Sequence, residues 1–228
     1  MADKPSRSLV IYGDGFAQLI HGHLNSFASH ASCGFLSLRE TEDKRAVKEV
    51  AQLFGVYDPT ISERFMGLKA AMLTLGFDVF HFNELASESL IWLGFQCGEV
   101  HETSKYDLVF IYVWIDKFVG FVMQLASPSS IGSRLHLSIV MSHGYISKIS
   151  SDLSFLFPQQ SYTMISGKLR HHSPLLIAQL QEAVTRKDLA KEFSFKEFKE
   201  HGGNHAIPAD RFLCEVAFKL WKAPKYGA

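Results

Sequence analysis

Residues 9–16, LVIYGDGF, join a short apolar run to a turn in which two glycines flank one acid. A run of this kind is typical of a buried strand in a parallel sheet. Ligands and metal ions in such sheets are usually held just beyond the carboxyl ends of the strands. Asp14 is therefore the first candidate for a functional residue.

Segments with strand character alternate with segments of helical periodicity along the rest of the chain. We expect strands at 9–12, 34–38, 77–80, 108–114, 136–141 and 175–178, and helices at 16–30, 41–54, 61–75, 85–93, 116–126 and 210–221. This alternation predicts an α/β fold with a mostly parallel sheet and helices on both of its faces. We expect residues 1–228 to form a single α/β domain, because chains of this length commonly build one core.

The composition excludes several classes of partner. Lys plus Arg and Asp plus Glu number 23 each, so a formal charge of zero gives no attraction to nucleic acid or to an anionic membrane. No apolar stretch approaches the roughly 20 residues of a membrane-spanning helix, and residues 1–8 are too polar for a signal peptide. The three scattered cysteines indicate buried thiols in a reducing compartment, so we expect a cytoplasmic protein. The oligomeric state stays open.

Two histidines join Asp14 as candidate ligands. His143 follows the strand expected at 136–141, and His172 precedes the strand expected at 175–178. A carboxylate with two neutral imidazoles suits a borderline divalent cation such as zinc or manganese. Sequence spacing leaves open whether the three side chains converge. The alternatives are that Asp14 caps the following helix and that each histidine is a packed or surface residue.

Several short segments follow one another in an informative order. Residues 10–15 read VIYGDG, residues 67–71 GLKAA, residues 105–111 KYDLVFI, residues 142–144 SHG and residues 172–177 HSPLLI. In this order they resemble motifs of the alkaline phosphatase superfamily and, within it, of the cofactor-independent phosphoglycerate mutases. The resemblance extends over most of the chain.

The resemblance implies phosphoryl transfer on a small phosphorylated metabolite, by an isomerase or a phosphatase. In that family two divalent ions polarise the phosphate and activate a hydroxyl nucleophile. The resemblance makes Asp14 the first metal ligand, His143 the histidine of an Asp-His-Gly motif and His172 the C-terminal histidine ligand. It implies manganese or zinc as the cofactor.

The chain also departs from the family's pattern. It has His21 where the family places its nucleophile, Asn25 where it places a carboxylate ligand, and Ser142 in place of the aspartate of Asp-His-Gly. After Trp114 it lacks the segment in which the family carries a further aspartate and histidine. The remaining donors suit one zinc ion better than two ions. Two hypotheses follow: a metal-dependent enzyme with no assigned nucleophile, or a catalytically degenerate relative (a pseudoenzyme) with a binding or structural role.

Overall fold

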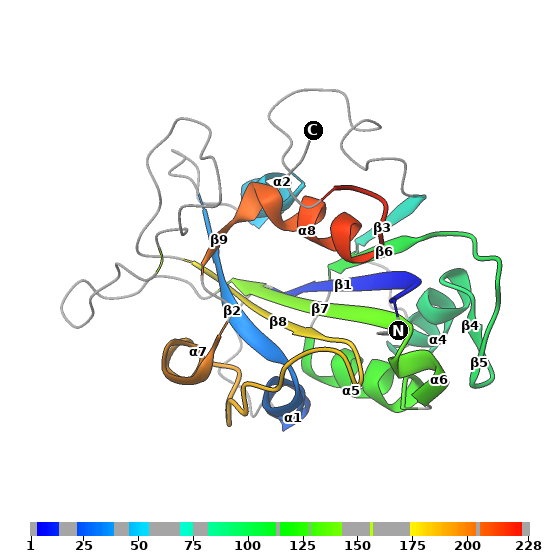
Figure 1. The fold of residues 1–228 in the computed structure, drawn as a ribbon, viewed down its shortest axis with the longest axis horizontal. Coiled ribbons are helices and arrows are strands. Elements are labelled where there is room, and N and C mark those ends of the chain that lie inside the picture. Colours follow the sequence, from blue (N-terminus) through cyan, green and yellow to red (C-terminus); the bar gives the residue numbers. More distant parts are fainter. Residues whose placement is uncertain are drawn as a thin grey trace.

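The computed structural model describes residues 4–13, 22–38, 46–54, 69–74, 82–112, 115–127, 129–142, 156, 174–203 and 206–224. Within them seven strands form one sheet in the order β3-β6-β1-β7-β8-β2-β9 (Figure 1). These strands are β1 (Arg7–Gly13), β2 (Ser32–Ser37), β3 (Ala70–Thr74), β6 (Leu108–Tyr112), β7 (Leu135–Ser142), β8 (Leu175–Leu180) and β9 (Ile207–Pro208). A separate hairpin consists of β4 (Phe95–Gln96) and β5 (Glu99–Val100).

Most neighbouring strands of the sheet run in the same direction. β1 pairs in parallel with β6 and β7, β3 pairs in parallel with β6, and β2 pairs in parallel with β9. β8 is the exception, because it is antiparallel to both of its neighbours, β7 and β2. The predicted α/β fold with a mostly parallel sheet is confirmed.

Helices cover both faces of the sheet (Figure 1). One face packs against α1 (Gly22–His30), α4 (Phe82–Trp92), α5 (Ile115–Leu125), α6 (Ser129–Gly132) and α7 (Phe195–His201). The other packs against α2 (Ala46–Leu53), the 3-10 helix η2 (Ala209–Arg211) and α8 (Phe212–Lys219). The sheet is therefore the middle layer of three, as an alternating α/β sequence requires.

Strand β1 shows why the opening segment is apolar at successive positions. Leu9 and Ile11 face the α1 and α5 side, whereas Val10 and Tyr12 face the α8 side. All four side chains are buried. A strand covered on both faces has no solvent-facing positions, so its sequence reads as a continuous apolar run instead of an alternating one.

The structure corrects the prediction between residues 61 and 75. Residues 70–74 form strand β3 and pair in parallel with β6, whereas the sequence pattern predicted a helix there. Short apolar runs are ambiguous between helix and strand, and pairing with a neighbouring strand decides between them. Residues 61–68 and the strand predicted at 77–80 lie outside the described residues.

The apolar spacing of the segment 210–221 predicts core positions at Phe212, Val216, Phe218 and Leu220, and the cluster SPSS at 127–130 predicts a turn. The structure differs from both predictions at one residue. Phe218 is 37% exposed, because Val216 and Ala217 occupy the side of α8 that faces the sheet, and Ser129 begins helix α6. The other three predicted core positions are buried.

The cysteines also differ from the expectation of buried thiols. Cys33 is buried, Cys214 is partly buried and Cys97 is exposed. Cys97 and Gly98 link β4 to β5 with positive φ angles of 53° and 81°. Two successive positive φ angles are the geometry of a tight hairpin turn, which places the Cys97 side chain at the surface.

We expect thiol reagents to label Cys97 long before Cys33. Burial, and then the charge of Asp188, raise the pKa of the Cys33 thiol to about 12. The thiolate is the reactive form, and a pKa raised in this way keeps Cys33 in its unreactive thiol form at mildly alkaline pH. Mass spectrometry after brief iodoacetamide treatment of the native protein checks this. Equal labelling of the two cysteines would contradict the burial of Cys33, and labelling in urea is the positive control.

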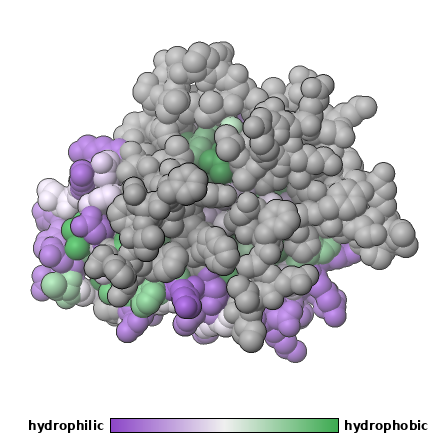
Figure 2. Space-filling model, turned by 180° about the vertical axis from the view of Figure 1, so that it is seen from behind, coloured by the Kyte–Doolittle hydropathy of each residue, from purple (hydrophilic) through white to green (hydrophobic). Residues whose placement is uncertain are grey.

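Polar and apolar residues both reach the described surface. In the view of Figure 2, polar residues predominate along the lower rim, and apolar residues form small areas between them. The large apolar side chains that are exposed come from different segments: Ile91, Val100, Leu125, Val184, Leu189, Phe218 and Trp221. Among the residues that the structure describes, no helix has the length and apolar character needed to cross a bilayer.

Candidate functional site

The ends of three adjacent strands meet at one edge of the sheet. Gly13, the last residue of β1, pairs with Met141 of β7. Ser142, the last residue of β7, pairs with Leu175, the first residue of the antiparallel strand β8. The carboxyl ends of β1 and β7 and the amino end of β8 therefore lie side by side. In α/β sheets, this is the kind of edge at which ligands bind.

The three predicted ligands are attached to these strand ends. Asp14 follows Gly13, His143 follows Ser142, and His172 precedes Leu175 by three residues. All three ligands lie outside the described residues. Their convergence on one cation stays a prediction.

A carboxylate that the sequence analysis did not single out lies near the same edge. Asp116 is the second residue of α5, which begins three residues after the end of β6. Its Oδ1 accepts hydrogen bonds from the backbone N–H groups of His23, at 3.1 Å, and Leu24, at 3.0 Å. An acidic side chain is stabilising at the first turn of a helix, where backbone donors have no partner within the helix. Asp116 thus fixes the start of α1 against α5.

Close packing brings α1 and α5 together at this point. A Cβ atom added to Gly120 of α5 would lie 2.7 Å from the ring of His23. A larger residue at position 120 would therefore displace the imidazole. The Gly120 contact and the Asp116 cap hold the first turn of α1 in one position.

Asn25 has a structural contact of its own. Its Oδ1 accepts a hydrogen bond of 2.9 Å from the backbone N–H of Phe193. This bond joins α1 to the segment that leads into α7. The amide thus holds two segments together at the position where the resemblance would place a carboxylate ligand.

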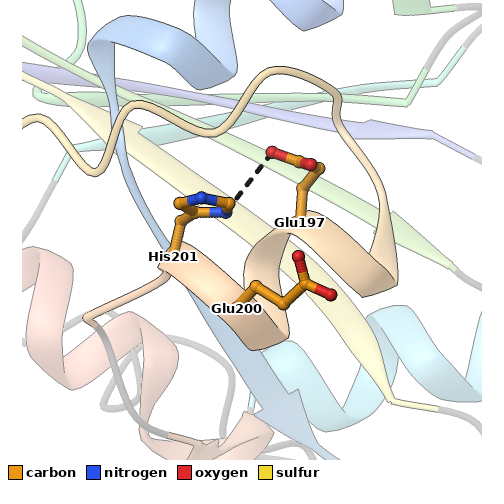
Figure 3. Close-up of side chains that lie close together, drawn as sticks. All are labelled: Glu197, Glu200 and His201. Atoms are coloured by element: carbon orange, nitrogen blue, oxygen red, sulfur yellow. Dashed lines mark ion pairs between the residues drawn. The ribbon is translucent and has the colours of Figure 1, made fainter.

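A separate group of potential ligands lies on α7. Each of Glu197, Glu200 and His201 offers one possible ligand atom, and these three atoms lie within 4.8 Å of one another. Figure 3 shows Glu197 and His201 facing each other one turn apart, with His201 Nδ1 3.4 Å from Glu197 Oε2. Glu197 Oε2 also accepts a hydrogen bond of 2.8 Å from the backbone N–H of Lys191. Because these contacts use the Glu197 carboxylate and the group is largely exposed, it is typical of a solvated helix face.

A buried carboxylate, Asp188, ties several backbone segments together. Its Oδ2 accepts hydrogen bonds from the backbone N–H groups of Cys33, at 2.8 Å, and Gly203, at 2.9 Å. Its Oδ1 accepts a hydrogen bond of 2.7 Å from Arg186 Nε. Burial alone would raise the pKa of Asp188, but the hydrogen bonds from Arg186, Gly203 and Cys33 outweigh it and lower the pKa. Both carboxylate oxygens of Asp188 therefore accept hydrogen bonds that stabilise the fold.

A cluster of polar side chains lies between the sheet and α8, in which His136, Ser138 and Gln179 are buried and Lys219 is partly buried. His136 and Ser138 lie on β7, Gln179 on β8 and Lys219 on α8. Lys219 Nζ donates to Gln179 Oε1 at 2.9 Å, and Gln179 Nε2 lies 3.2 Å from Ser138 Oγ and 3.3 Å from His136 Nε2. Ser138 Oγ is also 3.3 Å from His136 Nε2. These four side chains form one hydrogen-bonded network.

Burial governs the ionisation of this network. His136 is 1% exposed, and burial, followed by the charge of Lys219, lowers the pKa of its imidazole well below the ordinary value. Burial also lowers the pKa of Lys219 to about 8, although the charge of Glu215 acts in the opposite direction. The network is at the end of β7 that lies away from Ser142. It is therefore distinct from the predicted metal site.

Comparison with known sequences gives no assignment. No protein-family model matches the chain, and no curated protein matches its sequence.

Solved structures, in contrast, share its fold. The PH0037 protein from Pyrococcus horikoshii is similar over 100% of both chains, with a TM-score of 0.63 and 12% identity. Human ectonucleotide pyrophosphatase / phosphodiesterase 5 is similar over 97% of both chains, with a TM-score of 0.56 and 9% identity. At these low identities the likenesses show that the chain shares the α/β fold of these two proteins.

A cofactor-independent phosphoglycerate mutase from Thermoplasma acidophilum is also similar, over 67% of this chain and 36% of its own, with 14% identity. Its TM-score of 0.37 is too low to support an inference about mutase activity.

Proposed function

We propose that this protein is a metal-dependent phosphoesterase that acts on a small phosphorylated metabolite. In this proposal Asp14, His143 and His172 hold one zinc or manganese ion. The observation that carries it is the pairing of Gly13 with Met141 and of Ser142 with Leu175. This pairing brings together the three strand ends to which the proposed ligands are attached.

The donor set fits one cation. One carboxylate and two neutral imidazoles are a common protein set for catalytic zinc, which leaves a coordination position open to substrate. A bound cation would polarise a phosphoryl oxygen. Asp116 contributes indirectly, because its bonds to the N–H groups of His23 and Leu24 keep α1 beside α5 near the same edge. We assign this activity to a single α/β domain of residues 1–228 in the cytoplasm.

The finer assignment, a phosphoglycerate-mutase-like isomerase, follows from the order of the motifs alone. It requires a group that receives the phosphoryl group and returns it to the substrate. The position at which the family places its nucleophile is His21 in this chain. We therefore propose hydrolysis of a phosphate ester as the activity of this protein, and mutase activity as the less favoured alternative.

One observation favours a second candidate, a non-enzymatic relative with a binding or structural role. Asn25 Oδ1 bonds to the N–H of Phe193, and Asp116 Oδ1 bonds to the first turn of α1. Two polar groups that could have served a metal site are thus used to hold helices in place. A protein of this kind would keep the sheet, and the edge at which β1, β7 and β8 meet, but would not catalyse a reaction.

The two candidates differ in metal content and in activity. We expect the purified protein to bind about one zinc or manganese ion per chain, and to hydrolyse p-nitrophenyl phosphate when that metal is present. Asp14→Ala should lose both properties, because a carboxylate ligand is removed. His201→Ala, in the exposed group on α7, is the control and should retain both. Stoichiometric metal without hydrolysis would favour the non-enzymatic relative, and absence of metal would reject the proposed site.

A further inference from the structure

The end of α8 holds a tryptophan at the surface in a backbone conformation that disfavours it. Trp221 has a positive φ angle of 61° and is 75% exposed. Its N–H donates to Phe218 O at 2.9 Å, and the N–H of Lys222 donates to Ala217 O at 2.8 Å. These two bonds form the Schellman motif, in which the residue with positive φ is usually glycine because a Cβ atom is unfavourable there. Packing within the fold does not explain a bulky residue at this strained position, and strained residues of this kind concentrate at functional sites.

Basic side chains surround Trp221. Lys4 Nζ lies 5.1 Å from the centroid of a Trp221 ring, within the range of a cation–π interaction. Arg134 Nη1 donates to the backbone oxygen of Lys4 at 3.1 Å. Lys222 is the next residue along the chain, and its Nζ lies 3.9 Å from Asp107 Oδ2. The N-terminal segment, the start of β7 and the end of α8 thus bring three cations together.

The Asp107 carboxylate does not balance these charges. It is shared by two cations, because Arg7 Nη1 lies 4.0 Å from its Oδ1 on the other side from Lys222. Lys4 and Arg134 are exposed and have no ion pair within the part of the chain that the structure describes. The local charge is therefore positive, although the whole chain is neutral. Charges interact over about 8–10 Å in physiological salt, so the local charge decides whether an anionic surface is attracted here.

Two exposed aromatic rings accompany this positive charge. Phe218 lies one turn before Trp221 on α8 and is 37% exposed. Tryptophan and other apolar side chains flanked by lysine are typical of protein surfaces that lie at the boundary between lipid headgroups and acyl chains. A stable protein partner would need roughly 1,000 Å² of complementary surface, whereas the other large exposed apolar residues come from different segments. The combination therefore favours a lipid surface over a protein.

We propose that the Trp221 surface, formed by Lys4, Arg134, Phe218, Trp221 and Lys222, binds the surface of an anionic lipid bilayer. The two aromatic rings enter the headgroup region, and the three cations face the acidic headgroups. The cytoplasmic leaflets of cell membranes carry such lipids.

The Trp221 surface lies at the end of the sheet where β1 and β6 begin, because Lys4 precedes β1 and Asp107 precedes β6 (Figure 1). The carboxyl ends of β1 and β7 are at the opposite end of the sheet. A molecule bound through the Trp221 surface would therefore keep that edge away from the bilayer. Lipid binding of this kind is independent of the activity proposed for the carboxyl edge.

Sedimentation with lipid vesicles tests this proposal. We expect the protein to sediment with vesicles of phosphatidylcholine in which about one third of the lipid is phosphatidylserine, and not with vesicles of phosphatidylcholine alone. Added sodium chloride should release the protein, because salt screens the attraction between the cations and the headgroups. Equal binding to both kinds of vesicle, or binding to neither, would overturn the proposal.

Trp221→Gly separates lipid binding from folding. Glycine is the residue that the Schellman motif favours, so this variant should keep or raise the melting temperature while its affinity for the anionic vesicles falls by about tenfold or more. Leu189→Gly is the matched control, since Leu189 has a positive φ angle of 58°, is 65% exposed and lies between Lys187 and Lys191. This control should bind vesicles as the wild type does. Unchanged binding by Trp221→Gly, or an equal loss in Leu189→Gly, would overturn the proposal.

The contribution of charge is tested by Lys4→Gln and Lys222→Gln. Each substitution should weaken binding to the anionic vesicles by about fivefold, the effect of one basic residue near an anionic bilayer. Lys187→Gln is the control and should have no effect. A single-stranded oligonucleotide and polyglutamate are the competing anionic partners. If the wild type binds either of them through Trp221 and does not bind the vesicles, the lipid assignment is overturned.

Discussion

Replacement of Phe110 by alanine is expected to lower the free energy of unfolding by about 3–5 kcal/mol. Phe110 lies on β6 and is 2% exposed. Its ring packs 4.8 Å from the ring of Phe54 and 6.3 Å from that of Tyr12, measured between centroids. Alanine would leave a cavity between the sheet and α2 that these two rings cannot fill without moving. Urea denaturation followed by circular dichroism measures the loss.

The chain provides a matched control for this substitution in Phe218→Ala. Phe218 is 37% exposed on α8, so the same change of side chain should lower the free energy of unfolding by no more than about 1 kcal/mol. Comparable losses for the two variants would contradict the assignment of β6 to the core. An altered slope of unfolding free energy against urea would indicate a change in the denatured state instead.

The second large effect is expected from Asp188→Ala. This substitution leaves the backbone N–H groups of Cys33 and Gly203 without their acceptor, and it removes the partner of Arg186. We expect the free energy of unfolding to fall by about 3–5 kcal/mol, because these N–H groups would be shielded from water without the acceptor that they have in the wild type. Thermal and urea denaturation at neutral pH measure this loss.

The control for Asp188 is Arg186→Ala. The Arg186 side chain is 60% exposed, so its ion pair with Asp188 is screened by water and should contribute much less to stability than the two backbone hydrogen bonds. Equal losses for the two variants would mean that the ion pair, not the backbone bonds, stabilises this region. The pKa of Asp188 is lowered in the fold, so its stabilisation is present above the unfolded pKa of about 3.9 and disappears as the pH falls through the folded value.

Much of the sheet could be predicted because its strands are buried on both faces. The apolar runs at 9–12, 108–114, 136–141 and 175–178 each overlap an observed strand. The direction of a strand does not show in such a run, so the antiparallel pairing of β8 was not predictable. The segment of β3, AAMLT, is compatible with either a helix or a strand, and its pairing with β6 decides the outcome.

The candidate site was only partly visible in the sequence. Asp14 and His143 stand out because each follows an apolar run. Asp116 does not stand out in the sequence, because its role depends on α1, which lies more than 80 residues earlier. The buried network depends on residues that are distant in sequence, but it left one signal. His136 and Ser138 are polar, two positions apart, in a strand expected to be buried, so both face the same side.

The most direct test of the central claim is a crystal of the protein grown with zinc or manganese, with diffraction measured at the absorption edge of that metal. We predict one anomalous peak beyond Gly13 and Ser142, about 2.0–2.2 Å from a carboxylate oxygen of Asp14 and from a ring nitrogen of both His143 and His172. Side chains that point away from one another, or a peak confined to Glu197 and His201 on α7, would contradict it.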